Sequence, residues 1–257
     1  MQDGSLLEVQ EVSKVFGGLV AVHRVSFQAP TGKIMAIIGP NGAGKTTLFN
    51  TIAGLFPPSS GQIWFKGSKI SGRPSHHIAS LGIARTFQLL QLFTNMTVHE
   101  NVMVGRHPRS HAGFLSTALR LPGAVAEEKR IREKALEKLA LVGLESRAND
   151  TPLSLPYGQQ KLLEIARALA TEPDLLLLDE PAGGLSTREI EGLARQILDI
   201  RDSGVTVLLV EHRMELVMGI ADWIVVLNYG EKMAEGLPSQ IQNDERVIAA
   251  YLGDELD

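Results

Sequence analysis

The sequence predicts an α/β fold in which a mainly parallel sheet is flanked by helices. Apolar runs at residues 34–38, 174–178 and 205–210 have the composition of strands that are buried on both faces. Amphipathic helical patterns separate these runs, which is typical of parallel strands joined by helices. The alternating residues at 6–12 and 20–27 instead predict an antiparallel β subdomain ahead of the parallel sheet.

Composition limits the kinds of protein that this chain can be. Its 257 residues suffice for one sizeable core with a smaller inserted lobe, and its formal charge of −4 gives no basic field that would favour nucleic acid as a partner. The chain has no cysteine, which excludes disulfides, thiolate metal sites and a cysteine nucleophile. We find neither an apolar run of about 18 residues nor a basic leader followed by an apolar core, so we expect no membrane span and no signal peptide.

Between the first two predicted strands, Phe16 precedes Gly17 and Gly18. An aromatic ring beside such a loop could stack on a purine. Burial in the core is the more common fate of phenylalanine, and the residue pattern alone leaves both interpretations open.

The loop after residues 34–38 fits the phosphate-binding pattern G-x-x-x-x-G-K-[ST] and leads into a helix. Its glycines let backbone N–H groups turn toward a phosphate, Lys45 adds a positive charge between the β- and γ-phosphates, and the hydroxyl of Thr46 is placed for Mg²⁺. A Gly-rich turn that binds nothing is the alternative, although strand, loop and helix follow in the required order. We therefore predict a P-loop NTPase core. Nucleotide is expected at Gly39, Pro40, Asn41, Gly42, Ala43, Gly44, Lys45, Thr46 and Thr47.

The middle of the chain predicts short elements and one long helix. Residues 62–65 are expected to form a strand, and Thr97 with Glu100 a capping box at a helix start. Residues 105–113 are basic and broken by Gly and Pro, which predicts a loop or an arm. An amphipathic helix is expected over 127–142.

Polar side chains follow the later apolar runs. The run at 174–178 delivers Asp179 and Glu180, and the carboxyl end of a strand is where open α/β sheets place their chemistry. Asp179 suits the coordination of Mg²⁺, and Glu180 suits a base that orients or deprotonates water. Both carboxylates could instead merely cap the segment that follows.

The run at 205–210 delivers His212 in the same way, after a capping box formed by Ser186 and Glu189. A histidine at that edge can polarise a γ-phosphate or an attacking water, although by itself it could equally be structural. A terminal hairpin is expected over residues 223–235.

With these motifs in order, the chain resembles the ATPase subunits of ABC transporters over nearly its whole length. The resemblance implies that Phe16 stacks on adenine, that Asp179 and Glu180 are the Walker B aspartate and the catalytic carboxylate, and that His212 is the switch histidine. It also implies that Gln88 reaches Mg²⁺ and water while sensing the membrane subunit. Catalysis would then involve Glu180, His212 and Gln88, and Mg²⁺ would be held by Thr46, Gln88 and Asp179.

The resemblance further implies that residues 155–160 are a signature loop. Such a loop completes the ATP site of a partner subunit, here through Tyr157, Gly158 and Gln159. The usual signature is Leu-Ser-Gly-Gly-Gln, and Pro156 stands in place of the serine, so that no hydroxyl can donate to the partner's γ-phosphate. Loss of that charge-assisted hydrogen bond would weaken the site by about 1.5–3 kcal/mol, which suggests an asymmetric pair of sites. Ser186 similarly stands where an aspartate is usual, in a loop that serves communication between subunits.

Finer features are similar to the longer of the two paralogous ATPase subunits of branched-chain amino acid importers. They are residues 16–22, the form of the signature at 157–160 and the ending at 250–253. This likeness implies a subunit that uses ATP and Mg²⁺ to power uptake of branched-chain or related amino acids. A soluble ABC-type ATPase that acts as a mechanical clamp without transport remains the alternative.

The implied partners are a second ATPase subunit, either a paralogue or a second copy, and two multi-span permease subunits. A solute-binding protein would act indirectly, and no nucleic acid partner is expected. The chain would lie at the cytoplasmic face of the cell membrane through its permeases. As a weaker hypothesis, the basic segment at 106–121 docks on a membrane subunit or on lipid headgroups, or else it is a solvated loop.

These inferences predict a single ABC ATPase domain over residues 1–257. Residues 6–88 and 156–257 would form the α/β core together with the antiparallel β subdomain. Residues 89–155 would form an inserted helical subdomain.

Overall fold

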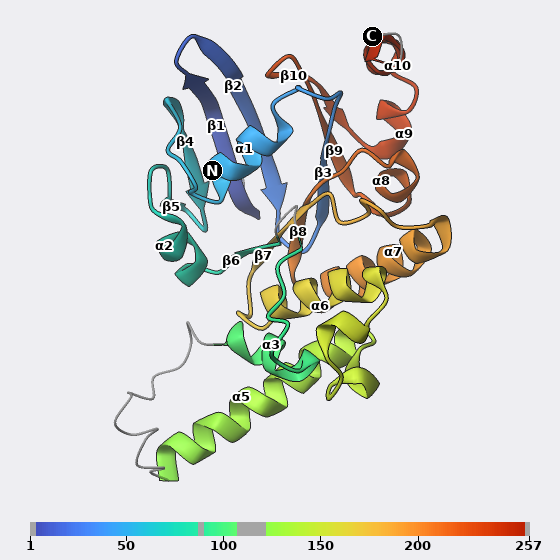
Figure 1. Cartoon of the computed structure of the whole chain (residues 1–257). Coiled ribbons are helices and arrows are strands. Elements are labelled where there is room, and N and C mark those ends of the chain that lie inside the picture. Colours follow the sequence, from blue (N-terminus) through green and yellow to red (C-terminus); the bar gives the residue numbers. More distant parts are fainter. Residues whose placement is uncertain (1–3, 87–89, 107–121, 255–257) are drawn as a thin grey trace. The chain divides into compact units, whose positions relative to one another are not determined.

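The computed structural model describes residues 4–86, 90–106 and 122–254. Packing divides the chain into two compact units (Figure 1). The first, which we call the sheet unit, comprises Met1–Arg85, Asp174–Gly184 and Ile190–Asp257; the second, the helical unit, comprises Thr86–Pro173 and Leu185–Glu189. None of the helices in the described ranges is long and apolar enough to cross a membrane.

The first sheet is antiparallel, with strand order β2-β1-β4-β5. Its strands are β1 (Ser5–Phe16), β2 (Leu19–Pro30), β4 (Ser60–Phe65) and β5 (Ser68–Lys69). Val9 of β1 pairs with Phe27 on one side and with Ile63 on the other. The first hairpin is longer than predicted because its strands continue to a tight turn at Gly17 and Gly18.

The second sheet has strand order β10-β9-β3-β8-β7-β6. Its strands are β3 (Ile34–Ile38), β6 (Ile83–Arg85), β7 (Leu175–Asp179), β8 (Thr206–Val210), β9 (Trp223–Asn228) and β10 (Glu231–Gly236). β10 pairs antiparallel with β9, and the other neighbouring strands run parallel. Ile37 pairs with Val210, and Leu178 with Leu209. The carboxyl ends of β3, β8 and β7 therefore meet at one edge of the sheet.

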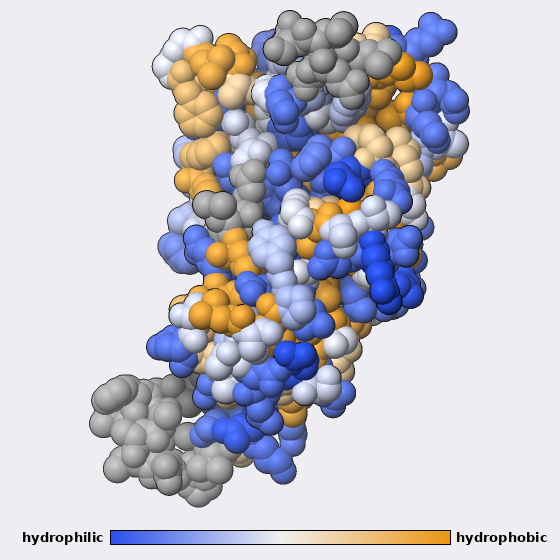
Figure 2. Space-filling model, turned by 45° about the vertical axis from the view of Figure 1, so that its right-hand side comes forward, coloured by the Kyte–Doolittle hydropathy of each residue, from blue (hydrophilic) through white to orange (hydrophobic). Residues whose placement is uncertain are grey.

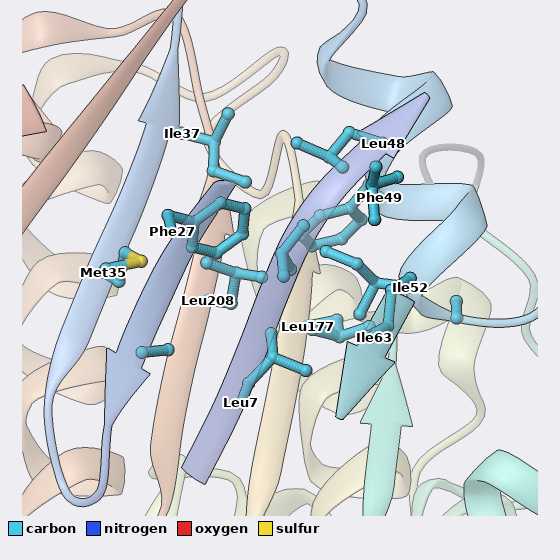
Figure 3. Close-up of a cluster of buried hydrophobic side chains, with 14 of the residues drawn as sticks. Leu7, Phe27, Met35, Ile37, Leu48, Phe49, Ile52, Ile63, Leu177 and Leu208 are labelled. Carbon is cyan, nitrogen blue, oxygen red and sulfur yellow. The ribbon is translucent and has the colours of Figure 1, made fainter. Parts of the chain in front are cut away.

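The main core fills the space between the two sheets and helix α1 (Lys45–Ile52), as Figure 3 shows. Leu48, Phe49 and Ile52 of α1 point toward side chains of both sheets, including Leu7 and Leu177. Each fully buried side chain of this size contributes about 1.5–3 kcal/mol through removal from water.

The other face of the parallel sheet has its own smaller core. Ala36 and Ile38 of β3 pack there, whereas Met35 and Ile37 face the main core. The helices of this part of the sheet unit are α8 (Met214–Ile220), α9 (Pro238–Ile241) and α10 (Glu245–Asp254). β3 is buried on both faces, which explains why its residues are apolar throughout.

Two more of the described helices contribute to the sheet unit. They are α2 (Ser75–Ser80), which precedes β6, and α7 (Thr187–Asp202), which precedes β8. α7 begins in the short segment that belongs to the helical unit and continues into the sheet unit. On the molecular face shown in Figure 2, hydrophobic residues occur in separate groups among hydrophilic ones.

The helical unit consists mainly of three helices that pack on one another. They are α3 (Val98–Val104), α5 (Pro122–Leu141) and α6 (Tyr157–Leu169), with the short 3₁₀ turns η2 (Glu145–Arg147) and η3 (Pro152–Ser154). The capping box of Thr97 and Glu100 is confirmed: Glu100 N donates to Thr97 Oγ1 at 3.2 Å, and Thr97 N donates to Glu100 Oε2 at 2.8 Å.

The extent of the helical unit differs from our expectation of 89–155. We placed residues after 155 in the core, but α6 packs on α3 and α5, and the unit continues to Pro173. The physical reason lies in α6, whose Leu163, Ala166 and Leu169 are buried on a helical face.

Residues 105–113 were expected to form a loop or an arm outside the core; residues 105 and 106, the described part, form a turn, but Arg106 is buried. Its guanidinium is buried, pairs with Glu172 at 2.9 Å and donates to the carbonyl of Ala170 at 3.3 Å. The ion pair joins residues that are distant in sequence, so the local basic composition gave no sign of it. Residues 107–121 lie outside the described residues, and the docking hypothesis for this segment stays a prediction.

Candidate nucleotide-binding site

The predicted phosphate loop connects β3 to α1 at the carboxyl edge of the parallel sheet. Gly39 has φ +151°, and a Cβ there would stand 2.1 Å from the carbonyl oxygen of Leu227. Gly44 has φ +91°, and its Cβ would stand 2.4 Å from the carbonyl oxygen of Ala21. Because neither backbone carbonyl can move away, both positions require glycine.

Lys45 opens α1, and its ammonium group is held inside the loop. Its Nζ donates to the carbonyl oxygens of Gly39 at 2.6 Å and Pro40 at 2.8 Å, and the residue is buried. The positive charge therefore stands at the helix N-terminus, where the helix dipole also favours an anion. Thr46 and Thr47 follow in the first turn and are partly exposed.

Asp179 ends β7, and its carboxylate is fully buried beside Arg85 of β6. Arg85 Nη2 donates to Asp179 Oδ2 at 2.7 Å, and Arg85 Nη1 donates to Asn50 Oδ1 of α1 at 2.5 Å. Burial raises the pKa of the Asp179 carboxyl above its ordinary value, while the hydrogen bond from Arg85 acts in the opposite direction. Arg85 thus ties β7 to the helix of the phosphate loop.

Arg85 is a residue that our sequence reasoning did not include in the site. The feature of the sequence that could have indicated its role is a positive charge at the carboxyl end of a strand, directly after two apolar residues. Its partners could not be read from that signal, since they depend on β6 lying next to β7.

Glu180 follows Asp179 in a left-handed backbone conformation. Its φ is +47°, which is uncommon for a residue with a side chain and is typically maintained by surrounding contacts at functional positions. Its N–H donates to the carbonyl of Val210 at 2.9 Å, and its carbonyl accepts from Gly183 at 3.1 Å. The backbone at the end of β7 is thereby fixed against β8.

His212 lies beyond β8, and the preceding Glu211 holds it in place. Glu211 is completely buried and accepts hydrogen bonds from the backbone N–H groups of Ala182, His212 and Arg213 at 3.0, 2.9 and 3.2 Å. Its Oε1 is also 3.4 Å from His212 Nδ1. The buried carboxylate therefore lies beside the half-exposed imidazole of His212. We had singled out His212 but not this carboxylate.

Phe16 is 44% exposed and is not a core residue. Its ring meets that of Phe56 edge to face, with centroids 5.2 Å apart, and Lys14 Nζ lies 4.9 Å from its centroid. An exposed ring with a neighbouring cation is suited to stack on a base whose phosphates are bound nearby.

The predicted signature loop leads into α6 of the helical unit. Pro156 is the N-cap residue and supplies no side-chain cap, and Tyr157 is 46% exposed, with Lys161 Nζ 5.6 Å from its ring centroid. Gly158 and Gln159 are partly exposed in the first turn. Gln88 lies outside the described residues, so its predicted roles in catalysis and in binding Mg²⁺ stay predictions.

The sheet topology brings together one set of the predicted residues. The phosphate loop, Asp179, Glu180 and His212 follow the adjacent strands β3, β7 and β8 at a single edge of the sheet. The arrangement supplies backbone and lysine groups for a polyphosphate, a buried carboxylate for a divalent cation, and a carboxylate and an imidazole for activation of water.

Comparison with known proteins agrees with this geometry. A family model described as ABC transporter matches residues 22–183, and a model described as branched-chain amino acid ATP-binding cassette transporter matches residues 231–257. The chain is 44% identical to the high-affinity branched-chain amino acid transport ATP-binding protein BraF of Pseudomonas aeruginosa and 42% identical to LivG of Escherichia coli K12, which carries the same description. Each match covers 97% of this chain and 98% of the relative.

Solved structures give the same result. The ADP conformation of MJ1267, an ATP-binding cassette of an ABC transporter, matches with a TM-score of 0.85 and 30% identity, over 97% of this chain and 99% of that chain. The dimeric post-hydrolysis state of the ATP-binding cassette MJ0796, bound to ADP and Pi, matches with a TM-score of 0.74 and 26% identity, over 90% of this chain and 98% of that chain.

Proposed function

The chain belongs to the ATP-binding proteins of ABC transporters, in the branched-chain amino acid group, and we propose that it is the ATP-hydrolysing subunit of an importer for branched-chain or related amino acids. The observation that carries the proposal is the meeting of the phosphate loop, Asp179, Glu180 and His212 at one sheet edge. The similarity to BraF and LivG over nearly the whole chain supports the substrate class.

ATP is the proposed substrate, bound through residues 39–47 and stacked on Phe16. Lys45 would exchange its carbonyl partners for the β- and γ-phosphate oxygens, which are stronger acceptors because they carry charge. Likeness to a cassette solved with ADP supports nucleotide binding at this fold.

The donors near the phosphate loop fit Mg²⁺. Thr46 offers a hydroxyl and Asp179 a carboxylate, both hard oxygen ligands, and a cation beside the buried Asp179 would stabilise its charged form against burial. Gln88 would be the further ligand. When bound, Mg²⁺ would neutralise charge that develops on the transferred phosphoryl group.

Hydrolysis is proposed to proceed on a water held between Glu180 and His212. Glu180 would take the proton of the water as it attacks, and Nε2 of His212 would hold the water or the γ-phosphate in line. Glu211 supports this role, since its buried carboxylate holds the backbone of His212 and lies 3.4 Å from Nδ1 of the imidazole.

We further propose that the chain works in a pair of ATPase subunits, either with a paralogue or with a second copy. Tyr157, Gly158 and Gln159 would complete the ATP site of the partner, and ATP would hold the two subunits together until hydrolysis. Two multi-span permeases at the membrane would receive the motion through the region of Gln88. The dimeric MJ0796 structure supports pairing as a property of such cassettes.

The rival function is a soluble ABC-type clamp without transport. A pull-down distinguishes the two: E180Q protein is recovered from gently solubilised membranes with ATP and Mg²⁺, and its companions are identified. We expect two multi-span proteins and an ATPase partner. Recovery of this chain alone, or with ribosomes or DNA, would refute the transport function.

Replacing Phe16 by alanine is expected to weaken ATP binding by about five- to 150-fold, because stacking of a base on an aromatic ring contributes about 1–3 kcal/mol. Binding of inorganic triphosphate should not change, since it has no base. L19A is the matched control, because Leu19 is a 67% exposed side chain in the same hairpin. Equal ATP affinities of F16A and L19A, measured by calorimetry, would argue against stacking.

Replacing Pro156 by serine is expected to strengthen ATP-dependent pairing about tenfold or more, since one charge-assisted hydrogen bond to the partner's γ-phosphate is worth about 1.5–3 kcal/mol. The serine would also cap α6, which now has no side-chain cap, and add about 0.5–2 kcal/mol of stability. The test is the ATPase rate and ATP affinity of the assembled complex. If neither changes, Pro156 does not limit one site.

A further inference from the structure

A carboxylate of this chain already contacts the N-terminus of the signature helix α6. Glu189, in the first turn of α7, lies with its Oε1 2.9 Å from the point that a Cβ on Gly158 would occupy. Hydrogen bonds from the side chain and backbone of Ser186 lower the pKa of Glu189, and the backbone N–H of Gly158, which lies close to this carboxylate, lowers it further. Both residues belong to the helical unit.

The same carboxylate also caps its own helix. Glu189 Oε2 accepts from Ser186 N at 2.9 Å and from Ser186 Oγ at 2.6 Å. The two carboxylate oxygens of Glu189 therefore have different neighbours. Oε2 accepts hydrogen bonds at the N-terminus of α7, and Oε1 faces the N-terminus of α6.

The N-terminus of α6 favours the binding of an anion. Its N-cap residue is Pro156, which supplies no side-chain acceptor for the first N–H groups. The positive end of the helix dipole therefore attracts whichever negative group can reach Gly158. In the isolated chain that group is Glu189.

We propose that the carboxylate of Glu189 competes with the γ-phosphate of the partner's ATP for the backbone N–H of Gly158. The inference rests on the proposed function, in which this helix end receives the nucleotide of the second ATPase subunit. Closure of the pair then requires Oε1 to leave the Gly158 N–H, while Oε2 can stay on Ser186. The exchange raises the nucleotide concentration at which the pair closes.

The chain contains a matched control for the ordinary capping role. Glu100 of α3 accepts from the corresponding groups, since its Oε2 accepts from Thr97 N at 2.8 Å and from Thr97 Oγ1 at 3.0 Å. Its pKa is lowered by these bonds, as that of Glu189 is by Ser186. The difference is the contact of Glu189 with a second helix, which is the signature helix.

The experiment compares E189Q with E100Q in the complex purified with its permeases and partner ATPase. Because the chain has no cysteine, a single introduced cysteine can carry a fluorescent label, with a second label on the partner. Closure is followed by energy transfer as the non-hydrolysable analogue AMP-PNP is added. Glutamine keeps the shape of glutamate and removes its charge.

We expect E189Q to lower the half-maximal AMP-PNP concentration about two- to fivefold, the range for one charge at a helix N-terminus, and E100Q to leave it unchanged. An unchanged or raised concentration for E189Q, with the wild-type complex closing normally, would overturn the competitor role alone. A wild-type complex that does not close would overturn the proposed function and this inference together.

Discussion

E180Q protein is expected to hydrolyse ATP about 10²- to 10⁴-fold more slowly than the wild type while still binding ATP. Glutamine has the size of glutamate and keeps a hydrogen-bonding oxygen, but it cannot accept the proton of the attacking water. The backbone hydrogen bonds of residue 180 to Val210 and Gly183 do not involve its side chain, so the substitution should leave the end of β7 in place. The measurement is the steady-state rate of phosphate release together with ATP affinity.

E191Q is the matched control for that prediction. Glu191 is exposed on α7, so the same chemical change should leave the rate of hydrolysis unchanged. A rate of phosphate release in E180Q equal to that in E191Q would show that Glu180 is not the base. Loss of ATP binding in E180Q would point instead to damage of the site.

Replacing Arg85 by methionine is expected to destabilise the protein by about 3–5 kcal/mol, because it removes the guanidinium that pairs with the fully buried carboxylate of Asp179. The rate of hydrolysis should fall as well, since Arg85 joins Asp179 to Asn50 at the helix of the phosphate loop. The free energy of unfolding is measured by denaturant titration.

Two further variants isolate the cause of that loss. R24M removes an ion pair whose side chains, Arg24 and Glu11, are 66% and 55% exposed, and it should change the free energy of unfolding little. The double variant R85M/D179N should recover much of the stability lost in R85M, because no charge is then left buried and unpaired. A cost for R85M equal to that for R24M would contradict the account.

Much of the fold was predictable because local patterns specify it. β3 is apolar throughout and β7 is apolar up to its last residue, Asp179, and both strands were expected where they lie. The capping box at Thr97 and the hairpin over 223–235 were also predicted correctly. In each case the residues that specify the element are close together in the sequence. They are the apolar run of a strand, the capping residues of a helix or the turn residues of a hairpin.

The unpredicted features involve residues that are distant in sequence. Arg85 pairs with Asp179 because β6 lies beside β7, and Arg106 pairs with Glu172 within the helical unit. Composition near either arginine indicated only positive charge. Glu211 was overlooked because a buried carboxylate that accepts backbone hydrogen bonds has no sequence pattern of its own.

The extent of the helical unit was misjudged for a related reason. Amphipathicity shows that α6 has an apolar face but not which partner covers it. The structure packs that face against α3 and α5.

The most direct test of the central claim is amino acid uptake by the complete complex in proteoliposomes, with ATP inside and the solute-binding protein outside. We predict that wild-type complex accumulates radiolabelled leucine, isoleucine or valine when ATP and Mg²⁺ are present, that E191Q complex does so equally, and that E180Q complex does not. Hydrolysis of ATP by wild-type complex without accumulation of any amino acid would contradict the account.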